Sequence, residues 1–215
     1  MKQSIRSFLI VSLLFTFFIF PKNAFAIIQR VGFNEYFVGF TSDYVNYWAH
    51  PAEFGRQLEP NWCWAASIQV SLNLLQIPVN QTQIVQEVFG SIQNVPGHTY
   101  QILGVLDQWR KNIDGKPLLL DSYVESSWIQ VLFDLQNNIP IILALRPPAS
   151  SIGHAVVVTG AVYKVNYGQP PFIEYLLIRD PWPSNPSLQR LPFPTVNSLI
   201  QKAIGIRIVS APYGF

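Results

Sequence analysis

Cysteine is almost absent from this sequence: Cys63 is the only one among 215 residues. A single thiol forms no disulfide within the chain, and it leaves no cysteine pair of the kind that holds structural zinc. A Gly-rich phosphate-binding loop and a basic stripe are also missing, so the common nucleotide and nucleic-acid sites are not expected. The sequence therefore predicts no cofactor, no metal and no nucleic-acid partner.

Charged residues are scarce as well. The first of them lie in an N-terminal segment that has the three-part layout of a secretory signal peptide. Lys2 and Arg6 precede an apolar run over residues 8–20, and the small-residue ending Ala24-Phe25-Ala26 follows. The run has 13 residues, fewer than the ~20 that a membrane-spanning helix needs. We predict cleavage after Ala26, a secreted or periplasmic location, and no stable membrane anchor in the mature protein.

Residues 27–215 then form the mature protein, which is long enough for one domain with a proper core and short for two. Removal of Lys2, Arg6 and Lys22 leaves 11 basic against 12 acidic residues, and this net charge of −1 gives no surface for a polyanion. A lone thiol in an oxidising compartment is open to oxidation and to pairing between chains. Cys63 is therefore more readily explained as a functional residue than as one without a role.

Cys63 lies at the predicted start of a helix. Pro60 ends any regular structure before it, while Ala66, Val70 and Leu74 recur at the spacing of a helix that buries one face. Free backbone N–H groups and the helix dipole favour an anion in the first turn, and the thiolate is the nucleophilic form of cysteine. The alternative is a buried, inert cysteine that acts as a small hydrophobe.

Helix signals dominate the first half of the mature chain and strand signals the second. After short strand-like or irregular segments at 27–54, helices are expected from the cysteine, from the capping box Asn80–Gln83 to Gly90, at 99–112, and after a cap at Ser126. Strands are expected at 118–124, 139–145, 154–163 and 172–180, then a short helix at 195–203 and a strand at 204–209. This order predicts an α+β fold, with a helical half packed against an antiparallel β-sheet half.

A cysteine nucleophile needs a base, a group that orients the base, and donors for the oxyanion. His154 begins a predicted strand, so its imidazole should project from the sheet edge toward the cysteine helix. Asp180 ends the neighbouring antiparallel strand, where it can accept from the imidazole N–H and fix the tautomer. Gln57, in the loop before the helix, can add its amide to the backbone N–H of Cys63 as an oxyanion donor.

Each of these residues also has a purely structural explanation. Asp180-Pro181 is a common turn opening, and Gln57 alone would be an ordinary surface residue. The other two histidines, His50 and His98, lie in polar loops, where we expect them to be solvated and outside the site. The four candidate residues together, with the cysteine on a helix and the histidine on a strand far downstream, indicate a cysteine-nucleophile site much more specifically than any one of them alone.

The motifs, in this order, resemble the papain-like cysteine peptidases. They are Gln57 with five intervening residues before Cys63-Trp64, Gly153-His154 before a valine-rich strand, and Asp180-x-Trp182. The strings after Cys63 and His154 are most similar to the bacterial C39-like and AvrRpt2-like (C70) branch. Two features depart from papain: it has asparagine where Asp180 stands, and the turn at 166–171 lengthens the interval from His154.

The resemblance implies a papain-like fold and four site residues: Cys63 as nucleophile, His154 as base and then acid, Asp180 as its orienter, and Gln57 as oxyanion donor. It also implies that Trp182 shields the histidine from water. The expected function is hydrolysis of a peptide or isopeptide bond in a peptide or protein substrate, through a thioester. Two alternatives stay open: a catalytically idle papain-like domain that binds peptides or proteins, and an acyl transferase that uses the same thioester.

Overall fold

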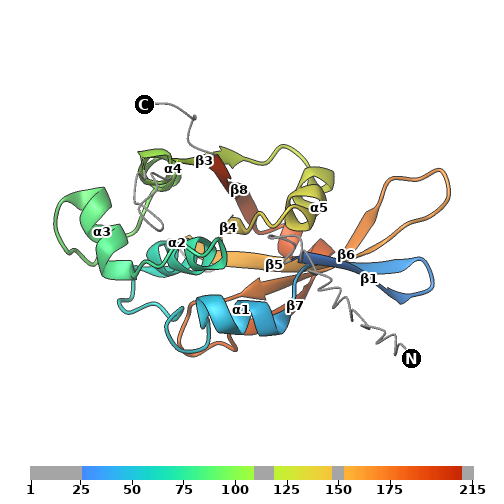
Figure 1. The fold of residues 1–215 in the computed structure, drawn as a ribbon, viewed down its shortest axis with the longest axis horizontal. Helices are drawn as coiled ribbons and strands as arrows, with labels where there is room; N and C mark the ends of the chain where they lie inside the picture. The colour runs from blue at the N-terminus through green and yellow to red at the C-terminus, as the bar shows by residue number, and fades with distance from the viewer. Residues whose placement is uncertain (1–25, 109–118, 147–152, 210–215) are drawn as a thin grey trace, which may run out of the picture.

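The computed structural model describes residues 26–108, 119–146 and 153–209, and within them the strands form one antiparallel sheet (Figure 1). The helices are α1 (Ser42–Ala49), α2 (Cys63–Leu74), α3 (Gln81–Phe89), α4 (Thr99–Gln108), α5 (Trp128–Gln136) and α6 (Phe193–Asn197). The strands are β1 (Ala26–Gly32), β2 (Glu35–Phe40), β3 (Leu119–Val124), β4 (Ile141–Leu145), β5 (His154–Lys164), β6 (Phe172–Arg179), β7 (Leu188–Pro192) and β8 (Ile200–Val209).

Strand β5 is the centre of the sheet. Strands β4 and β2 pair one after the other along one of its edges, and β6 pairs along the other. The antiparallel register of β5 and β6 sets Arg179 opposite Val157. Asp180, the next residue, therefore leaves the sheet at the end where His154 enters it, although 26 positions separate the two in sequence.

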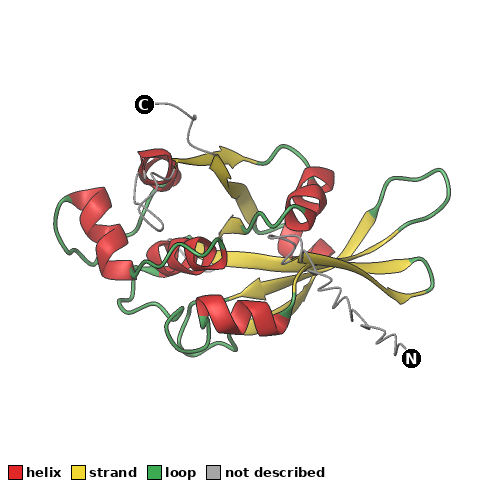
Figure 2. Cartoon of the chain, in the orientation of Figure 1, coloured by secondary structure: helices red, strands yellow, loops and turns green. Residues whose placement is uncertain are grey.

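Helices lie on both faces of the sheet, as Figure 2 shows. Ala155 and Val157 pack into the core under helices α1 to α4, while Val156 and Val158 pack into a second core with α5 and α6. Successive strand residues point to opposite faces, so β5 is apolar on both. This explains the continuous hydrophobic run after His154 and confirms the predicted association of a helical part with an antiparallel sheet.

Helix α2 is buried more completely than its sequence spacing predicts. Every residue from Trp64 to Leu72, and also Leu74, is buried, including Ser67 and Ser71. Small side chains such as Ala65 and Ala66, both fully buried, allow close packing of the helix on the sheet. Cys63 is the exception at the N-terminal end, since its side chain stays partly accessible.

The caps predicted for α3 are confirmed. Asn80 accepts from the backbone N–H of Gln83, and the Gln83 side chain accepts from the backbone N–H of Asn80, which closes the capping box. Gly90 ends the helix in the left-handed region, with φ of 69°, a conformation that glycine adopts without steric cost.

The structure differs from several of the elements expected from the sequence. Residues 42–49, expected to be irregular, form α1, because the Thr41 hydroxyl caps the helix by accepting from the N–H of Tyr44. Ser127, not Ser126, caps α5. The helix expected at 195–203 is α6, which ends at Asn197, and β8 already begins at Ile200 because it pairs with β4. The proline-rich segment after Pro181 also contains strand β7, which pairs with β6.

The expected signal peptide lies outside the described residues, apart from Ala26, which opens β1. The end of the helix expected at 99–112 and part of the loop before His154 also lie outside them. Across residues 26–108, 119–146 and 153–209, every helix is too short or too polar to cross a bilayer.

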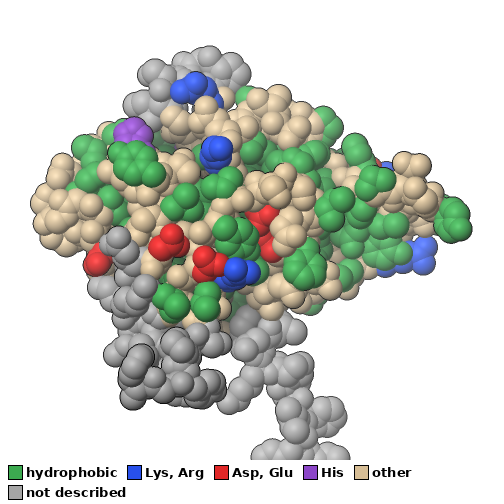
Figure 3. All heavy atoms as spheres, turned by 90° about the horizontal axis from the view of Figure 1, so that it is seen from above, with side chains coloured by type: hydrophobic (Ala, Val, Ile, Leu, Met, Phe, Trp, Pro, Cys, Tyr) green, Lys and Arg blue, Asp and Glu red, His purple; other side chains and the backbone are tan. Residues whose placement is uncertain are grey.

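Two hairpins project from the sheet at the end remote from His154. Phe33 in the β1–β2 turn and Tyr167 in the β5–β6 turn are highly exposed, and Val165 N–H donates to the Asn34 carbonyl between the tips. Figure 3 shows hydrophobic side chains gathered at this end of the molecule. Because β5 runs from His154 to Lys164, this apolar end is separated from the site by the length of the strand.

An acidic pair joins the end of β3 to α5: Glu125, which is partly exposed, and Asp134, which is buried. Tyr123 Oη donates to Asp134 Oδ2 at 2.9 Å, and Gln130 Nε2 donates to Asp134 Oδ1 at 3.0 Å. Burial raises the pKa of Glu125 to about 8, and the hydrogen bond and repulsion from the Asp134 carboxylate add to the effect. Glu125 therefore keeps its proton in the folded protein over a range where the unfolded chain releases it.

We expect the substitution Glu125→Gln to flatten the dependence of stability on pH. A carboxyl with a raised pKa makes stability fall as pH rises from about 4.5 to about 8, because only the folded state still binds the proton. Partial exposure of Glu125 screens the repulsion, so the effect on Tm is moderate. The Tm of the variant minus the Tm of the wild type should be about 2–4 °C larger at pH 8.5 than at pH 4.5. Thermal unfolding followed by circular dichroism measures it.

Glu53→Gln is the control, since Glu53 is an exposed carboxylate elsewhere in the chain. It should leave the wild-type pH dependence unchanged. Equal Tm differences for Glu125→Gln at both pH values would show that the acidic pair does not hold a proton.

Candidate active site

Cys63 is the first residue of α2, and two buried tryptophans flank it. The indole Nε1 of Trp62 donates to the Gln93 carbonyl at 2.7 Å, and that of Trp64 donates to the Val95 carbonyl at 3.1 Å. Gly97 lies against the Trp64 ring so closely that a Cβ would come within 2.5 Å of it. These contacts fix the start of the helix against residues 93–97 and hold the backbone that carries the thiol.

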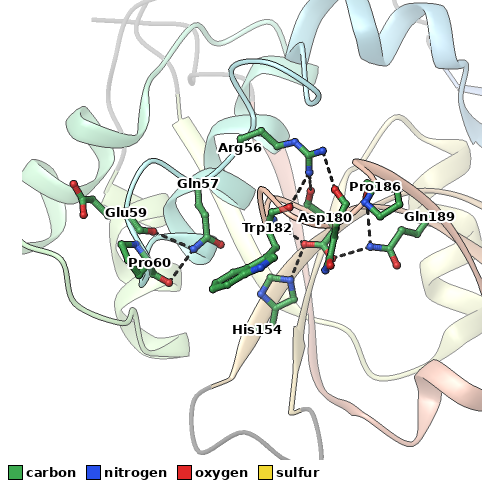
Figure 4. Close-up of polar contacts among 10 residues, drawn as sticks. Arg56, Gln57, Glu59, Pro60, His154, Asp180, Trp182, Pro186 and Gln189 are labelled. Atoms are coloured by element: carbon green, nitrogen blue, oxygen red, sulfur yellow. Dashed lines mark hydrogen bonds and ion pairs between the residues drawn. The ribbon is translucent and has the colours of Figure 1, made fainter.

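His154 and Asp180 are in direct contact, as Figure 4 shows. The distance from His154 Nε2 to Asp180 Oδ1 is 2.8 Å, and the side chains are 20% and 5% exposed. Because Nε2 is taken by the carboxylate, Nδ1 is the ring nitrogen left to face the thiol of Cys63, which lies near enough to raise the pKa of His154. The structure thus brings the thiol, the imidazole and the carboxylate together.

The carboxylate of Asp180 accepts four hydrogen bonds. Oδ1 accepts from His154 and from the backbone N–H of Trp182 at 2.9 Å. Oδ2 accepts from Asn185 Nδ2 at 2.7 Å and from Gln189 Nε2 at 2.8 Å. Burial alone would raise the pKa of Asp180, but donors from His154, Trp182 and Asn185 outweigh it and lower the pKa below its ordinary value.

The pKa of His154 is raised to about 9. Burial by itself lowers it, whereas the hydrogen bonds to Asp180 and to Cys63, and the attraction of their negative charges, raise it by more. His154 is therefore an imidazolium at neutral pH. This cation lies close to the N-terminus of α2, where Cys63 begins the helix.

Trp182 covers one side of the histidine. Its ring meets the imidazole edge to face, with centroids 6.4 Å apart and planes at 84°. Trp182 is itself 41% exposed, and the expectation that it shields the histidine from water stays a prediction. A hydrogen bond in a drier environment is electrostatically stronger.

Gln57 is buried next to this group, but its amide is turned toward its own loop. Nε2 donates to the carbonyls of Glu59 at 3.0 Å and Pro60 at 2.8 Å, which uses both of its hydrogens. Oε1 is buried and has no hydrogen-bond partner. Gln57 therefore holds the loop before Cys63 in this conformation, and its role as oxyanion donor stays a prediction.

The remaining histidines lie elsewhere. His50 ends α1 in the left-handed region, with φ of 41°, and packs against Phe54. His98 stacks on Tyr100 with ring centroids 5.7 Å apart. Within the described ranges, no group of three or more His, Cys, Asp or Glu side chains is arranged to hold a metal ion.

Sequence reasoning missed three residues at the site. Asn185 and Gln189 bind the far oxygen of Asp180, and the Arg56 side chain binds the backbone of the same loop. No sequence signal distinguishes two amides in a proline-rich segment from surface residues. For Arg56 there was a sequence signal, because it directly precedes Gln57, a residue already assigned to the site.

The fold is that of a papain-like protein of the C39 peptidase type. The peptidase domain of Streptococcus ComA, a bifunctional ABC transporter involved in quorum sensing, has a similar structure, with a TM-score of 0.50 and 14% sequence identity. The similarity covers 73% of this chain and 96% of that one.

Residues 43–199 match the Peptidase C39-like family, and since this is well over half of the chain, the protein belongs to that family. The Salmonella effector SpvD, in its R161 variant, is a more distant structural match, with a TM-score of 0.33, 13% identity and coverage of 86% and 84% of the two chains. The comparison with curated proteins gave no match.

We expect Asp180→Ala to lower the pKa of His154 from about 9 to 6.5 or below. The substitution removes the main hydrogen bond that raises this pKa and leaves the burial that lowers it. Titration of the histidine ring protons by NMR measures the shift, with the His154 signal assigned from its loss in His154→Gln.

Asp121→Ala provides the control, because Asp121 binds Arg207 on the distant strands β3 and β8. It should leave the His154 titration at about 9. In the wild type, the raised pKa stabilises the folded state below pH 6.5, and this contribution is lost as pH rises toward 9. A His154 titration that Asp180→Ala does not shift would contradict the proposed pairing.

Proposed function

We propose that this protein is a secreted or periplasmic cysteine peptidase that hydrolyses an amide bond in a peptide or protein substrate. The observation that carries the proposal is the grouping of Cys63, His154 and Asp180, in which the histidine ring binds the carboxylate and lies near the thiol. Membership of the Peptidase C39-like family supports the same reaction class. The bond is a peptide or isopeptide bond, and no metal or cofactor takes part.

Attack begins from the thiolate of Cys63. The sulfur adds to the substrate carbonyl carbon, and the carbonyl oxygen takes up the negative charge. The backbone N–H groups at the start of α2 are suitable donors for it, because Trp62 at the N-cap provides no side-chain hydrogen bond to them. His154, protonated below about pH 9, gives its proton to the leaving amine as the thioester forms.

Water then hydrolyses the thioester. Neutral His154 accepts a proton from the attacking water and so becomes the imidazolium again, while the oxygen of the water adds to the thioester carbon. The tetrahedral intermediate then collapses, the C–S bond breaks, and the Cys63 thiolate and the acid product separate. Asp180 stays ionised throughout, since its four hydrogen bonds favour the charged form. It holds the ring orientation in which Nδ1 faces the sulfur.

Gln57 joins this mechanism by a small rotation of its amide. A half turn would set Oε1 against the carbonyls of Glu59 and Pro60, which is unfavourable because all three are acceptors. A partial rotation keeps the shorter bond to Pro60 and releases the other N–H toward the oxyanion. The unpartnered Oε1 makes the present orientation easier to leave.

Cys63→Ala should abolish hydrolysis, because the chain has no second thiol to replace it. Peptide-library profiling of the wild type against this variant measures the loss and identifies the substrate. Wild-type labelling by iodoacetamide well below pH 8 would indicate the reactive thiolate. Slow labelling with the pH profile of an ordinary thiol would favour the idle binding domain instead, and aminolysis of the thioester by an added amine would favour the acyl transferase.

Gln57→Ala should lower kcat by about 10²- to 10³-fold, the usual effect of losing one oxyanion donor, while iodoacetamide labelling of Cys63 persists. Gln169→Ala is the matched control, since Gln169 lies in the exposed β5–β6 turn. Unchanged kcat in Gln57→Ala would limit Gln57 to the structural role that its present hydrogen bonds describe.

A further inference from the structure

Arg56 reaches from the cysteine half of the molecule to the loop that carries Asp180. Nη1 donates to the carbonyls of Asp180 at 2.9 Å and Trp182 at 3.0 Å, and Nη2 donates to the carbonyl of Asn185 at 2.9 Å. Figure 4 shows the guanidinium above this loop, on the other side of it from the imidazole. Three carbonyl acceptors for two guanidinium nitrogens suit the rigid fork of an arginine, which a lysine ammonium lacks.

The backbone around Arg56 is held in place independently of this contact. Gln81, fully buried at the start of α3, donates to the Arg56 carbonyl at 2.7 Å and accepts from the Leu58 N–H at 2.9 Å. Between them, the Gln57 N–H donates to the Pro181 carbonyl at 2.9 Å. Residues 56–58 are thus fixed to the helical half, and Arg56 extends that fixed point to residues 180–185.

The loop from Asp180 to Asn185 controls the carboxylate that binds His154. The Trp182 N–H donates to Oδ1 and the Asn185 side chain donates to Oδ2. The backbone carbonyls of Asp180, Trp182 and Asn185 accept the hydrogen bonds from Arg56. A change in the loop backbone would therefore move two donors of the carboxylate and the carboxylate itself.

We propose that Arg56 is a positioning residue: by clamping the carbonyls of Asp180, Trp182 and Asn185, it fixes the Asp180 carboxylate, and through it the His154 ring, relative to Cys63. This inference rests on the proposed function, because positioning matters only where His154 and Cys63 react. Arg56 touches neither ring nor sulfur in its hydrogen bonds, so its effect passes through the loop.

A purely electrostatic role of Arg56 makes the opposite prediction for His154. Removing a nearby positive charge favours protonation and raises the pKa of a histidine. Loosening the loop weakens the hydrogen bond that His154 donates to Asp180 and lowers that pKa from about 9 toward 6.5. The direction of the shift therefore separates positioning from charge.

The experiment compares Arg56→Met, which keeps the length of the side chain and removes the donors, with Arg56→Lys, which keeps the charge and loses the fork. We expect the pKa of His154, measured by NMR, to fall by one unit or more in Arg56→Met and to a smaller extent in Arg56→Lys. The pH profile of Cys63 alkylation by iodoacetamide should move to higher pH in the same order. With fluorescein-labelled casein as substrate, kcat should fall by about 10²-fold with little change in KM.

Arg207→Met is the control, because it also removes the hydrogen bonds of an arginine side chain, in this case those from Arg207 on β8 to the Asp121 carboxylate. It should leave all three readouts unchanged. A lower Tm for Arg56→Met with unchanged His154 titration and alkylation would reduce Arg56 to a structural contact and overturn the inference, as would a raised His154 pKa. Should Arg56→Met fail to fold, Arg56→Lys decides the question by the same two readouts.

The two proposals fail in different ways. If the wild type itself lacks a reactive thiolate and cleaves no peptide, the proposed function is wrong. If the wild type reacts and the Arg56 variants react equally well, only the role of Arg56 is wrong.

Discussion

The hydrogen bond between His154 and Asp180 is the interaction on which the rest of the site depends. It joins the first residue of β5 to the residue that follows β6, so its 2.8 Å length requires the correct register of both strands. It also reverses the effect of burial on the imidazole, which would otherwise lose its proton. The carboxylate can do this because four donors keep it ionised inside the protein.

The core of the fold determines where these groups meet. Helix α2 is buried on nearly all sides between the sheet and the neighbouring helices, so the position of Cys63 is set by apolar packing. The position of Asp180 is set at the end of β6, where packing gives way to a loop. Hydrogen bonds fix this loop: the backbone N–H of Gln57 and the side chain of Arg56 bind it to the cysteine half.

Periodic and local features could be predicted from the sequence. The capping box at Asn80 and the helix that begins at Cys63 depend on residues a few positions apart, and the apolar run of β5 depends on burial on both faces. Helix α1 was missed because its residues are largely aromatic and polar, and its stability comes from packing Val45 and Ala49 into the core. The contacts of Asn185, Gln189 and Arg56 depend on loop conformation, which no periodicity encodes.

The use of hydrogen bonds at this junction follows from what a catalytic site needs. Apolar side chains packed between the two halves would hold them firmly, but they would also cover Cys63, which is partly accessible. Directional bonds to backbone carbonyls fix the geometry from the side and leave the thiol open. A guanidinium that pairs with backbone carbonyls also avoids competing with His154 for the Asp180 carboxylate. The same loop can therefore be held rigidly from one side while its carboxylate serves the histidine on the other.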